Sequence, residues 1–362
     1  MKLYLPAARC ESFRNPPGSW HNGEMTTEFA MAAEWAAHRR SWICWPAREE
    51  VWGGPQGLKR AKRCFADVIR AMAAFEPVCL AVRPVDADEA RTALAGIARV
   101  TLFEVPIDDS WVRDTGPTYL TDGATVRTLQ WRFNAWGGKY EPYDQDAQLA
   151  TRIAAHTGLP CSSLPLICEG GAIHTDGEGT LMATRQTLCN PNRNVDLSEA
   201  EIEAQLLAAT GTRKMLWLDD GFADEETDGH IDNIAAFAAP GVVLIGVPAY
   251  AEAPDADAID RAVETLKNAR DAAGRALKVI AVEQPAKVRH DWRARPLNAS
   301  YLNFVFVNGG IILPAFDDPN DDKAKALFAK VFPTRKIVQV DARAVLQGGG
   351  GLHCITLAEP AV

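Results

Sequence analysis

The stretch HIDNIAAFAAPGVVLIGV, residues 230–247, decides the fold because it joins two apolar runs through a short turn. Pro240 and Gly241 suit a hairpin turn, in which a residue with positive φ is needed. An amphipathic helical pattern follows at 255–274, and a short apolar strand pattern follows at 278–283. The whole segment therefore predicts two antiparallel strands, a helix and a third strand, a ββαβ unit.

Three other stretches repeat this pattern of an apolar run, a glycine-containing turn and a second apolar run. They lie at 117–131, 172–184 and 301–315, and each precedes a helical pattern and a short apolar strand. In the segment after 172–184, Ser198 and Glu201 have the spacing of a capping box at the start of a helix. Recurrence of one unit along a chain is typical of a closed, repeated architecture.

The N-terminal region supplies only part of a fifth unit: a strand at 41–46, a helix near 58–75 and a strand at 78–82. The missing strand can come from GLHCITL, residues 351–357, near the other end of the chain. We therefore expect an α/β fold in which five units close into a propeller around a central cavity, leaving no exposed sheet edge. The alternative is one open, doubly wound sheet, which is weakened because no G-x-G-x-x-G follows an early strand.

Composition limits the class of protein. With 47% apolar residues the 362-residue chain can build a large core, and we expect one catalytic domain over 29–362 preceded by a poorly ordered extension over 1–28. The net charge of -9 argues against nucleic acid and favours a cationic ligand. The eight cysteines show neither C-x-x-C nor zinc-site spacing, and no apolar run approaches the roughly 20 residues needed to span a bilayer. We expect a cytoplasmic protein with reduced thiols and no membrane partner.

Reactive and charged residues fall at equivalent places, near the start of the predicted hairpins: Asp114, Glu169, His230, Asp232 and Cys354. In a ring these positions would face one cavity. Cysteine attacks as its thiolate, histidine moves protons near neutral pH, and spare carboxylates suit a planar, multiply donating cation such as guanidinium. Each residue alone has a structural explanation, as a core thiol, a buried histidine or an ion pair of Asp114 with Arg113. Their joint recurrence favours a site.

The expected geometry of this site assumes that its residues lie on strands. His230 and Asp232 would then point to the same side. His353, adjacent to Cys354, would point to the opposite face, so the proton-transferring histidine is assigned to His230.

Taken together, these blocks resemble the agmatine deiminases, which belong to the guanidine-modifying (pentein) superfamily and to the wider Porphyromonas-type peptidylarginine deiminase family. The resemblance runs from about residue 29 to residue 360. It is carried by MAAEWAAHRRSWICWP (31–46), DDSWVRDTGPT (108–118), WRFNAWGGKY (131–140), EGGAIHTDGEGTLMAT (169–184), LCNPNRN (188–194), ETDGHIDN (226–233), ASYLNFVFVNGG (299–310), FDDPNDDKA (316–324) and GGGGLHCIT (348–356).

The resemblance implies a pentein propeller that hydrolyses agmatine to N-carbamoylputrescine and ammonia without cofactor or metal, as a step in putrescine and polyamine biosynthesis. It also implies a role for each site residue: Cys354 as nucleophile, His230 as proton carrier, Asp114 and Asp232 as guanidinium ligands, Glu169 as the support of His230, Trp111 and Trp136 as channel walls, and Gly350 and Gly351 as backbone close to the substrate. A homodimer is a further expectation.

The chain departs from the family pattern at several positions, one of which is TLAEP (356–360), where glutamines are usual after the threonine. Gly351 and Leu352 occupy the places of an asparagine and an isoleucine, and Gln130 stands where an acid is expected. Recognition of the far end of the substrate is therefore open.

Several alternative functions remain at this stage. They are a deiminase of free or peptidyl arginine, with Arg113, Arg193 or Arg295 as partners for a carboxylate; an amidinotransferase; and a binding protein without turnover.

Overall fold

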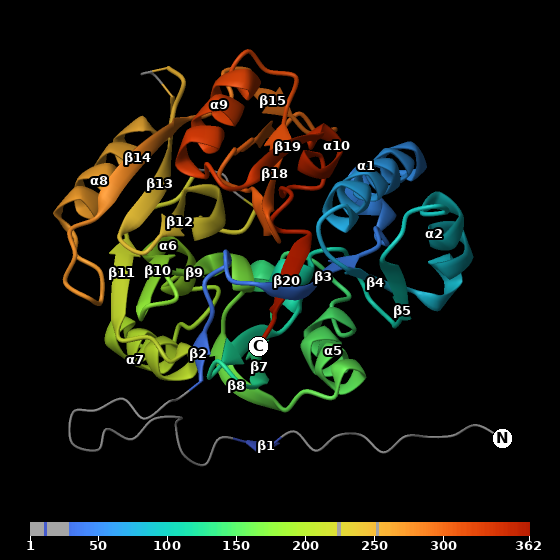
Figure 1. Cartoon of the computed structure of the whole chain (residues 1–362), viewed down its shortest axis with the longest axis horizontal. Coiled ribbons are helices and arrows are strands. Elements are labelled where there is room, and N and C mark those ends of the chain that lie inside the picture. The colour runs from blue at the N-terminus through green and yellow to red at the C-terminus, as the bar shows by residue number, and fades with distance from the viewer. Residues whose placement is uncertain (1–10, 13–28, 223–225, 251–252) are drawn as a thin grey trace.

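The computed structural model describes residues 11–12, 29–222, 226–250 and 253–362, which form a mixed α/β fold (Figure 1). The stretch that predicted a hairpin contains β12 (Ala235–Ala239) and β13 (Val242–Val247), which pair antiparallel. Helix α8 (Ala256–Asn268) follows, and β14 (Lys278–Glu283) then pairs parallel with β13. The predicted ββαβ unit is confirmed here.

The same order of elements recurs in the other three predicted units. In each, the two hairpin strands are antiparallel and the last strand is parallel to the second. The units are β6 (Thr118–Thr121), β7 (Val126–Arg132), α5 (Leu149–Thr157) and β8 (Cys161–Ile167); β9 (Ile173–Thr175), β10 (Thr180–Thr184), α7 (Glu199–Thr210) and β11 (Lys214–Leu218); and β17 (Val305–Val307), β18 (Gly310–Ala315), α9 (Asp321–Val331) and β19 (Lys336–Asp341). Ser198 caps α7 in the predicted capping box with Glu201.

The two ends of the chain meet in one sheet. Strand β3 (His38–Cys44), helix α1 (Pro55–Ala73) and strand β4 (Val78–Val82) form the N-terminal part, and β20 (Thr356–Pro360) pairs antiparallel with β3. Strand β5 (Val100–Glu104), preceded by α2 (Ala87–Ala93), adds an edge that the sequence did not predict. Its side chains are only partly buried, so its apolar pattern is weak. The prediction that the C-terminal segment completes the N-terminal unit is confirmed.

Shorter elements complete the description. Strand β2 (Ala30–Met31) pairs with β6, β1 (Glu11–Ser12) pairs with β8, and β15 (Arg289–His290) pairs with β16 (Pro296–Leu297). The short helices are α3 (Val112–Thr115), α4 (Ala135–Gly138), α6 (Arg185–Leu188), α10 (Arg343–Leu346), η1 (Glu49–Trp52), η2 (Pro84–Asp86), η3 (Asp146–Gln148), η4 (Gly170–Ala172) and η5 (Ile231–Asn233). Apart from Glu11–Ser12, the extension expected to be poorly ordered lies outside the described residues.

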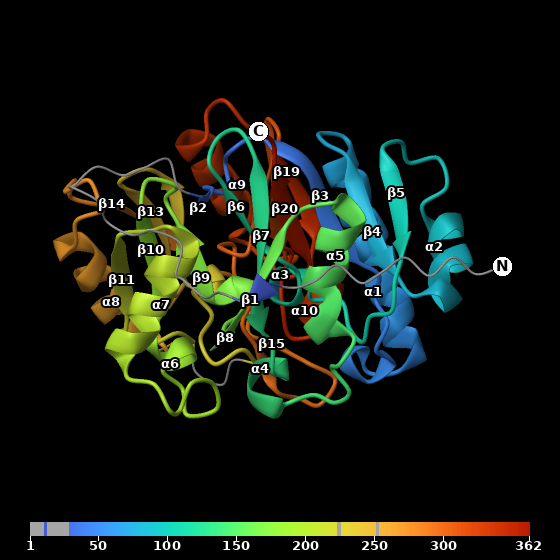
Figure 2. The same cartoon turned by 90° about the horizontal axis from the view of Figure 1, so that it is seen from below.

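Helices α1, α2, α5, α7, α8 and α9 occupy the periphery of the molecule, and strands such as β3, β9 and β20 lie inside them (Figures 1 and 2). Strand β20 lies near the middle of both views. Among the residues that the structure describes, none of the helices has the length and apolar character needed to span a bilayer. The short turns that lead into the hairpins lie inside this shell of helices, and three of them, at α3, η4 and η5, pack against one another. The candidate residues lie in or beside these turns.

Candidate active site

The turns before the hairpins bring the five reactive residues into one buried cluster. Asp114 lies in α3 before β6, Glu169 precedes η4, His230 and Asp232 lie at η5, and Cys354 precedes β20. The short helices α3, η4 and η5 pack in sequence, α3 against η4 and η4 against η5. Relative exposure is 0% for Glu169 and His230, 2% for Asp232, 3% for Cys354 and 6% for Asp114. This degree of burial makes every unpaired charge in the cluster costly.

His230 lies between two carboxylates. Its Nδ1 is 3.9 Å from Asp114 Oδ1, and its Nε2 is 3.6 Å from Glu169 Oε2. Burial alone lowers the pKa of His230, but Asp114, Glu169 and Asp232 outweigh it and raise the pKa to about 9. The ring is therefore an imidazolium at neutral pH and can donate a proton.

Asp114 is fixed from two sides. The Gly171 amide donates to its Oδ1 at 2.9 Å, and Trp136 Nε1 donates to its Oδ2 at 2.9 Å. Trp136 itself has φ 54° and ψ 40°, a left-handed backbone that costs a bulky residue about 1–3 kcal/mol. Burial raises the pKa of Asp114, with Asp232 and Glu169 adding to the rise and His230 opposing it. The strained turn at Trp136 thus serves to aim an indole donor at a site carboxylate.

Cys354 is positioned by Asn303 and Asp232. Asn303 Nδ2 lies 3.3 Å from the Sγ, and Asn303 Oδ1 accepts from the Cys354 amide at 3.3 Å. Asp232 Oδ2 lies 3.6 Å from the same sulfur. Burial raises the pKa of the Cys354 thiol well above its usual range, and the charges of Asp232 and Asp114 raise it further. The thiol of the free protein is consequently protonated at neutral pH, and a cation nearby would lower its pKa.

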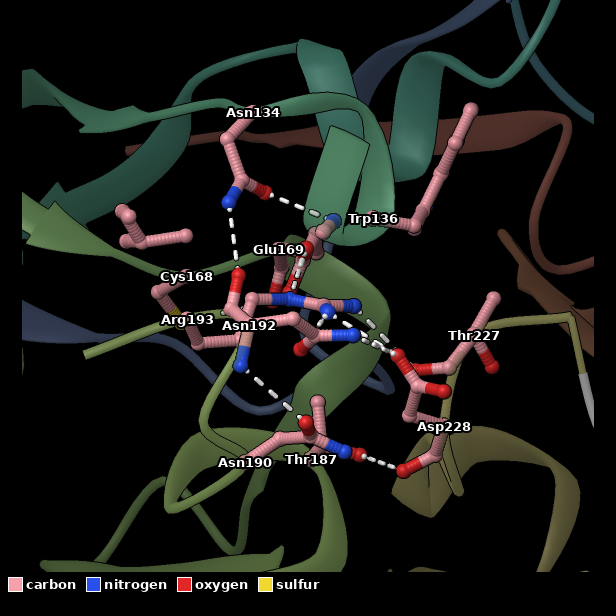
Figure 3. Close-up of polar contacts among 12 residues, drawn as sticks. Asn134, Trp136, Cys168, Glu169, Thr187, Asn190, Asn192, Arg193, Thr227 and Asp228 are labelled. Atoms are coloured by element: carbon pink, nitrogen blue, oxygen red, sulfur yellow. Dashed lines mark hydrogen bonds and ion pairs between the residues drawn. The ribbon is translucent and has the colours of Figure 1, made fainter. Parts of the chain in front are cut away.

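Glu169 is held by a guanidinium of the protein (Figure 3). Arg193 Nε donates to Glu169 Oε1 at 2.7 Å, while Arg193 Nη1 donates to Asp228 Oδ2 at 3.0 Å and to Asn192 Oδ1 at 2.6 Å. Burial raises the pKa of Glu169, but His230 and Arg193 outweigh it, so the pKa is lowered. Glu169 is therefore ionised and keeps its second oxygen for His230.

Four polar atoms of the cluster are buried without a hydrogen-bond partner among the described residues: both ring nitrogens of His230, Glu169 Oε2 and Asp232 Oδ1. Buried polar groups are nearly always paired in folded proteins, so such a concentration indicates a place for a ligand. The cluster is rich in carboxylates around one thiol. It suits a small, planar cation with several N–H donors.

Two hollows lie on the side of the molecule that carries Glu226 and Arg295. A cavity of about 1340 Å³ and a small hollow of about 40 Å³ share Glu226, Arg295 and Pro296 in their walls, and the hollow reaches Asn233 and Gly350. Arg295 Nη1 donates to Glu226 Oε2 at 3.2 Å, and the Tyr140 hydroxyl donates to Glu226 Oε1. The carboxylate of Glu226 thus lines the same hollow as Gly350.

Residues 30–360 match the sequence profile of the family described as Porphyromonas-type peptidyl-arginine deiminase. The chain belongs to this deiminase family.

Individual members of the deiminase family cover nearly the whole chain. An agmatine deiminase of Pseudomonas fluorescens is 39% identical over 94% of this chain and 98% of its own length. One of Pseudomonas aeruginosa is 39% identical over 92% of this chain and 96% of its own. The solved structure of an agmatine deiminase of Enterococcus faecalis superposes with a TM-score of 0.87 at 34% identity, covering 92% of this chain and 96% of that one.

Two expectations about the local geometry of this family member were wrong. His230 and Asp232 lie in the single turn of η5, and Cys354 lies in the turn before β20, so none of the three is on a strand. His353 consequently does not point away: its Nδ1 is 2.8 Å from Asp232 Oδ2. Alternation between opposite faces holds only for extended backbone, and the Thr356 hydroxyl, which donates to the carbonyls of Leu352 and His353, closes this turn instead.

The remaining predicted residues take packing positions beside the cluster. Trp111 stacks on Trp52 with ring centroids 5.8 Å apart. A Cβ on Gly350 would lie 2.5 Å from the Trp111 ring, and one on Gly351 would lie 2.3 Å from Asn303 Oδ1. The departure at Gly351 is thus explained by the close approach of Asn303. Gln130 contacts α5 through Thr151 and lies outside the cluster.

Gly171 gives a test of how tightly this deiminase site is packed. A Cβ there would lie 2.7 Å from His230 Nδ1 and 3.0 Å from both Asp114 Oδ1 and Asp232 Oδ2. Gly171→Ala should therefore displace all three groups and lower kcat/KM about 10²-fold, the usual cost of a misplacement near 1 Å. The measurement is steady-state turnover of a guanidine substrate.

Gly310→Ala is the matched control for Gly171→Ala, because its Cβ would lie 2.6 Å from the Phe75 ring in the core. It should lower the melting temperature and leave kcat/KM within about twofold, since the crowding at Gly310 falls on Phe75 and not on a residue of the cluster. Equal activity of Gly171→Ala and wild type would contradict the close packing.

Proposed function

We propose that the protein is an agmatine deiminase, a hydrolase that converts agmatine and water to N-carbamoylputrescine and ammonia. The observation that carries this proposal is the convergence of a thiol, an imidazolium and unpartnered carboxylate oxygens in one buried cluster. The names of the relatives that cover nearly the whole chain support it. The same reaction supplies a precursor for putrescine and polyamine biosynthesis.

The roles of the five residues follow from their positions. Asp114 and Asp232 bind the guanidinium nitrogens, because each presents carboxylate oxygen toward the space beside Cys354 and His230. Holding the cation in this way localises positive charge on its central carbon. The Cys354 thiolate then attacks that carbon, which forms a C–S bond and a tetrahedral adduct.

His230 completes both halves of the reaction. It donates its proton to the departing nitrogen, so the C–N bond breaks, ammonia leaves and an S-alkylthiouronium remains on Cys354. The neutral imidazole next takes a proton from water, whose oxygen attacks the same carbon. Collapse of the second tetrahedral adduct breaks the C–S bond and releases the ureido product and the thiolate, while the proton of the adduct's hydroxyl is lost to solvent and converts the released ammonia to ammonium. Glu169, anchored by Arg193, stabilises the imidazolium form of His230.

Formation of the thiolate depends on the substrate. Burial raises the pKa of the Cys354 thiol well above its usual range in the free protein. A bound guanidinium places a positive charge beside the sulfur and favours loss of the proton. The substrate therefore activates its own nucleophile, and an anionic ligand in the same place would not.

The charged residues around the cluster suit the ammonium group of agmatine better than the α-carboxylate of arginine. Arg113 pairs with Glu34 at 2.8 Å, Arg193 with Glu169, and Arg295 with Asp291 at 2.8 Å and with Glu226, so each arginine considered for an α-carboxylate already has acidic partners. Glu226, which lines the hollow that also borders Asn233 and Gly350, suits an ammonium group. We infer that Glu226 binds the distal amine after exchanging Arg295 for it.

Glu226→Gln should therefore raise KM for agmatine about tenfold while kcat changes little, because one hydrogen bond to a charged group is lost in the ground and transition states alike. The measurement is ammonia release as a function of agmatine concentration, with arginine as the second substrate. Glu50→Gln, an exposed acid in the wall of the same cavity, is the control and should leave KM unchanged. An unchanged KM in Glu226→Gln removes this residue from substrate binding.

The architecture that fits this function best is a five-bladed α/β propeller with the cluster on its axis. The four ββαβ units and the sheet that joins β20 to β3 support five blades. We propose that 29–362 form a single catalytic domain. A homodimer and a cytoplasmic location stay predictions.

The decisive experiment for the function compares agmatine, free arginine and an arginine peptide, each followed by ammonia release and ureido colorimetry. Faster turnover of agmatine is the expected result. A preference for free arginine or for the arginine peptide would instead make the protein a deiminase of that substrate. A second amine added to the assay identifies an amidinotransferase, because the amidino group would then reach the amine. Binding of agmatine without ammonia would leave a binding protein.

A further inference from the structure

His353 lies between the carboxylates of Asp232 and Glu34. Its Nδ1 is 2.8 Å from Asp232 Oδ2, and its Nε2 is 2.8 Å and 3.0 Å from the two oxygens of Glu34. His353 and Asp232 are buried, and the Glu34 side chain is 12% exposed. Only the doubly protonated ring has an N–H for each carboxylate. The geometry thus calls for an imidazolium at His353.

The other charged groups around His353 agree with this state. Arg113 Nη1 donates to Glu34 Oε1 at 2.8 Å, and His174 Nε2 lies 3.9 Å from Glu34 Oε2. Burial and Arg113 lower the pKa of His353, but Glu34 and Asp232 outweigh them and raise it. Burial lowers the pKa of His174 to about 4, so that ring is neutral and His353 carries the charge.

We propose that His353, held by Glu34, is a positioning residue that keeps Asp232 ionised, with Oδ2 occupied and Oδ1 left for the guanidinium. The proposal rests on the proposed function, because it assigns a task to Asp232 in binding that substrate. Asp232 Oδ1 is the oxygen of this carboxylate that is buried without a partner, as a reserved acceptor should be.

The same contacts link Asp232 to the nucleophile. Asp232 Oδ2 is 3.6 Å from Cys354 Sγ, and the imidazolium on that oxygen offsets the negative charge that opposes a thiolate. The Arg113 amide donates to the Cys354 carbonyl at 3.2 Å, and the Arg113 side chain ends on Glu34. Glu34 therefore contacts both Arg113, whose amide holds the Cys354 carbonyl, and His353, which holds Asp232.

The test compares His353→Asn and Glu34→Gln with wild type through kcat/KM as a function of pH on agmatine. His353→Asn should lower kcat/KM about 10- to 100-fold, the loss of one hydrogen bond between charged groups. The acid limb of the profile should also move to higher pH, because loss of the imidazolium raises the pKa of Asp232 and ionised Asp232 is needed for binding. Glu34→Gln preserves shape and should shift the limb in the same direction by less.

His174→Gln is the matched control, since it removes a buried, neutral histidine that faces the same Glu34. It should lower the melting temperature without moving the acid limb. Wild-type pH profiles in both test variants overturn the positioning role, and so does a loss of rate in His353→Asn that leaves the limb in place. Failure of the wild-type protein to release ammonia from any guanidine removes the proposed function, and this inference with it.

Discussion

Cys354→Ala should abolish ammonia release from agmatine, lowering kcat by at least about 10⁴-fold, as removal of a catalytic nucleophile does in other enzymes. The Cys354 sulfur lies 3.6 Å from Asp232 and 3.3 Å from Asn303 Nδ2, and the other partners in the cluster have no atom that can form a covalent bond to the guanidinium carbon as readily. The alanine variant should still bind agmatine, because the carboxylates remain. Calorimetry of the variant measures that binding separately from turnover.

The covalent intermediate can be observed directly in the wild-type protein. Acid quenching during turnover, followed by digestion and mass spectrometry, should place an aminobutyl-amidino adduct, which is agmatine less ammonia, on the peptide that contains Cys354. Cys79→Ala is the matched control, since Cys79 is a free, buried thiol in the core strand β4. It should keep full activity. Full turnover by Cys354→Ala, or an adduct on another cysteine, would exclude Cys354 as the nucleophile.

His230→Asn should lower kcat roughly 10²- to 10⁴-fold, the range for loss of a general acid and base. The raised pKa of His230, about 9, predicts how the wild-type rate depends on pH. Protonated His230 is required to release ammonia, so kcat/KM should hold below that pKa and fall as the pH rises through about 9. This basic limb should disappear from the residual activity of His230→Asn.

His156→Asn serves as the control for His230→Asn, because His156 lies exposed on α5 with its ring against Phe103. Its kcat and its basic limb should equal those of wild type. Persistence of the limb near pH 9 in His230→Asn would assign it to another group, and Cys354 would be the first to examine.

The hairpins could be predicted from the sequence because their signals are local. Turns such as Pro240-Gly241 lie between apolar runs of strand length, and each of the four predicted hairpins is present. The pairing of β3 with β20 could be predicted only because the N-terminal unit has one strand fewer than the other units. Strand β5 was missed because its partly buried edge position leaves a weak pattern.

The candidate site could be predicted only in part. The repeat of the ββαβ unit shows where in the sequence the site residues lie, but it does not show their backbone conformations. Asn303 stands just before β17, equivalent to the places of Asp114 and His230 in their units, so the same rule would have found it. Arg193 follows α6 in a loop whose sequence has no helical or strand periodicity. The residues next to it in the sequence do not predict its contact with Glu169. The turn geometry of η5, and that of the turn before β20 that directs His353 toward Asp232, depend on tertiary contacts that no local pattern encodes.

The pairing of β20 with β3 sets an order of events during synthesis. Trp42 on β3 donates to Glu359 on β20 across 317 positions of the chain. Until the residues of β20 have left the ribosome, the turn that carries Cys354 is not anchored to β3, even though earlier units can already fold. A partly made chain therefore has its carboxylates and His230 without an anchored nucleophile, and we expect guanidine turnover to begin only after β20 has paired with β3.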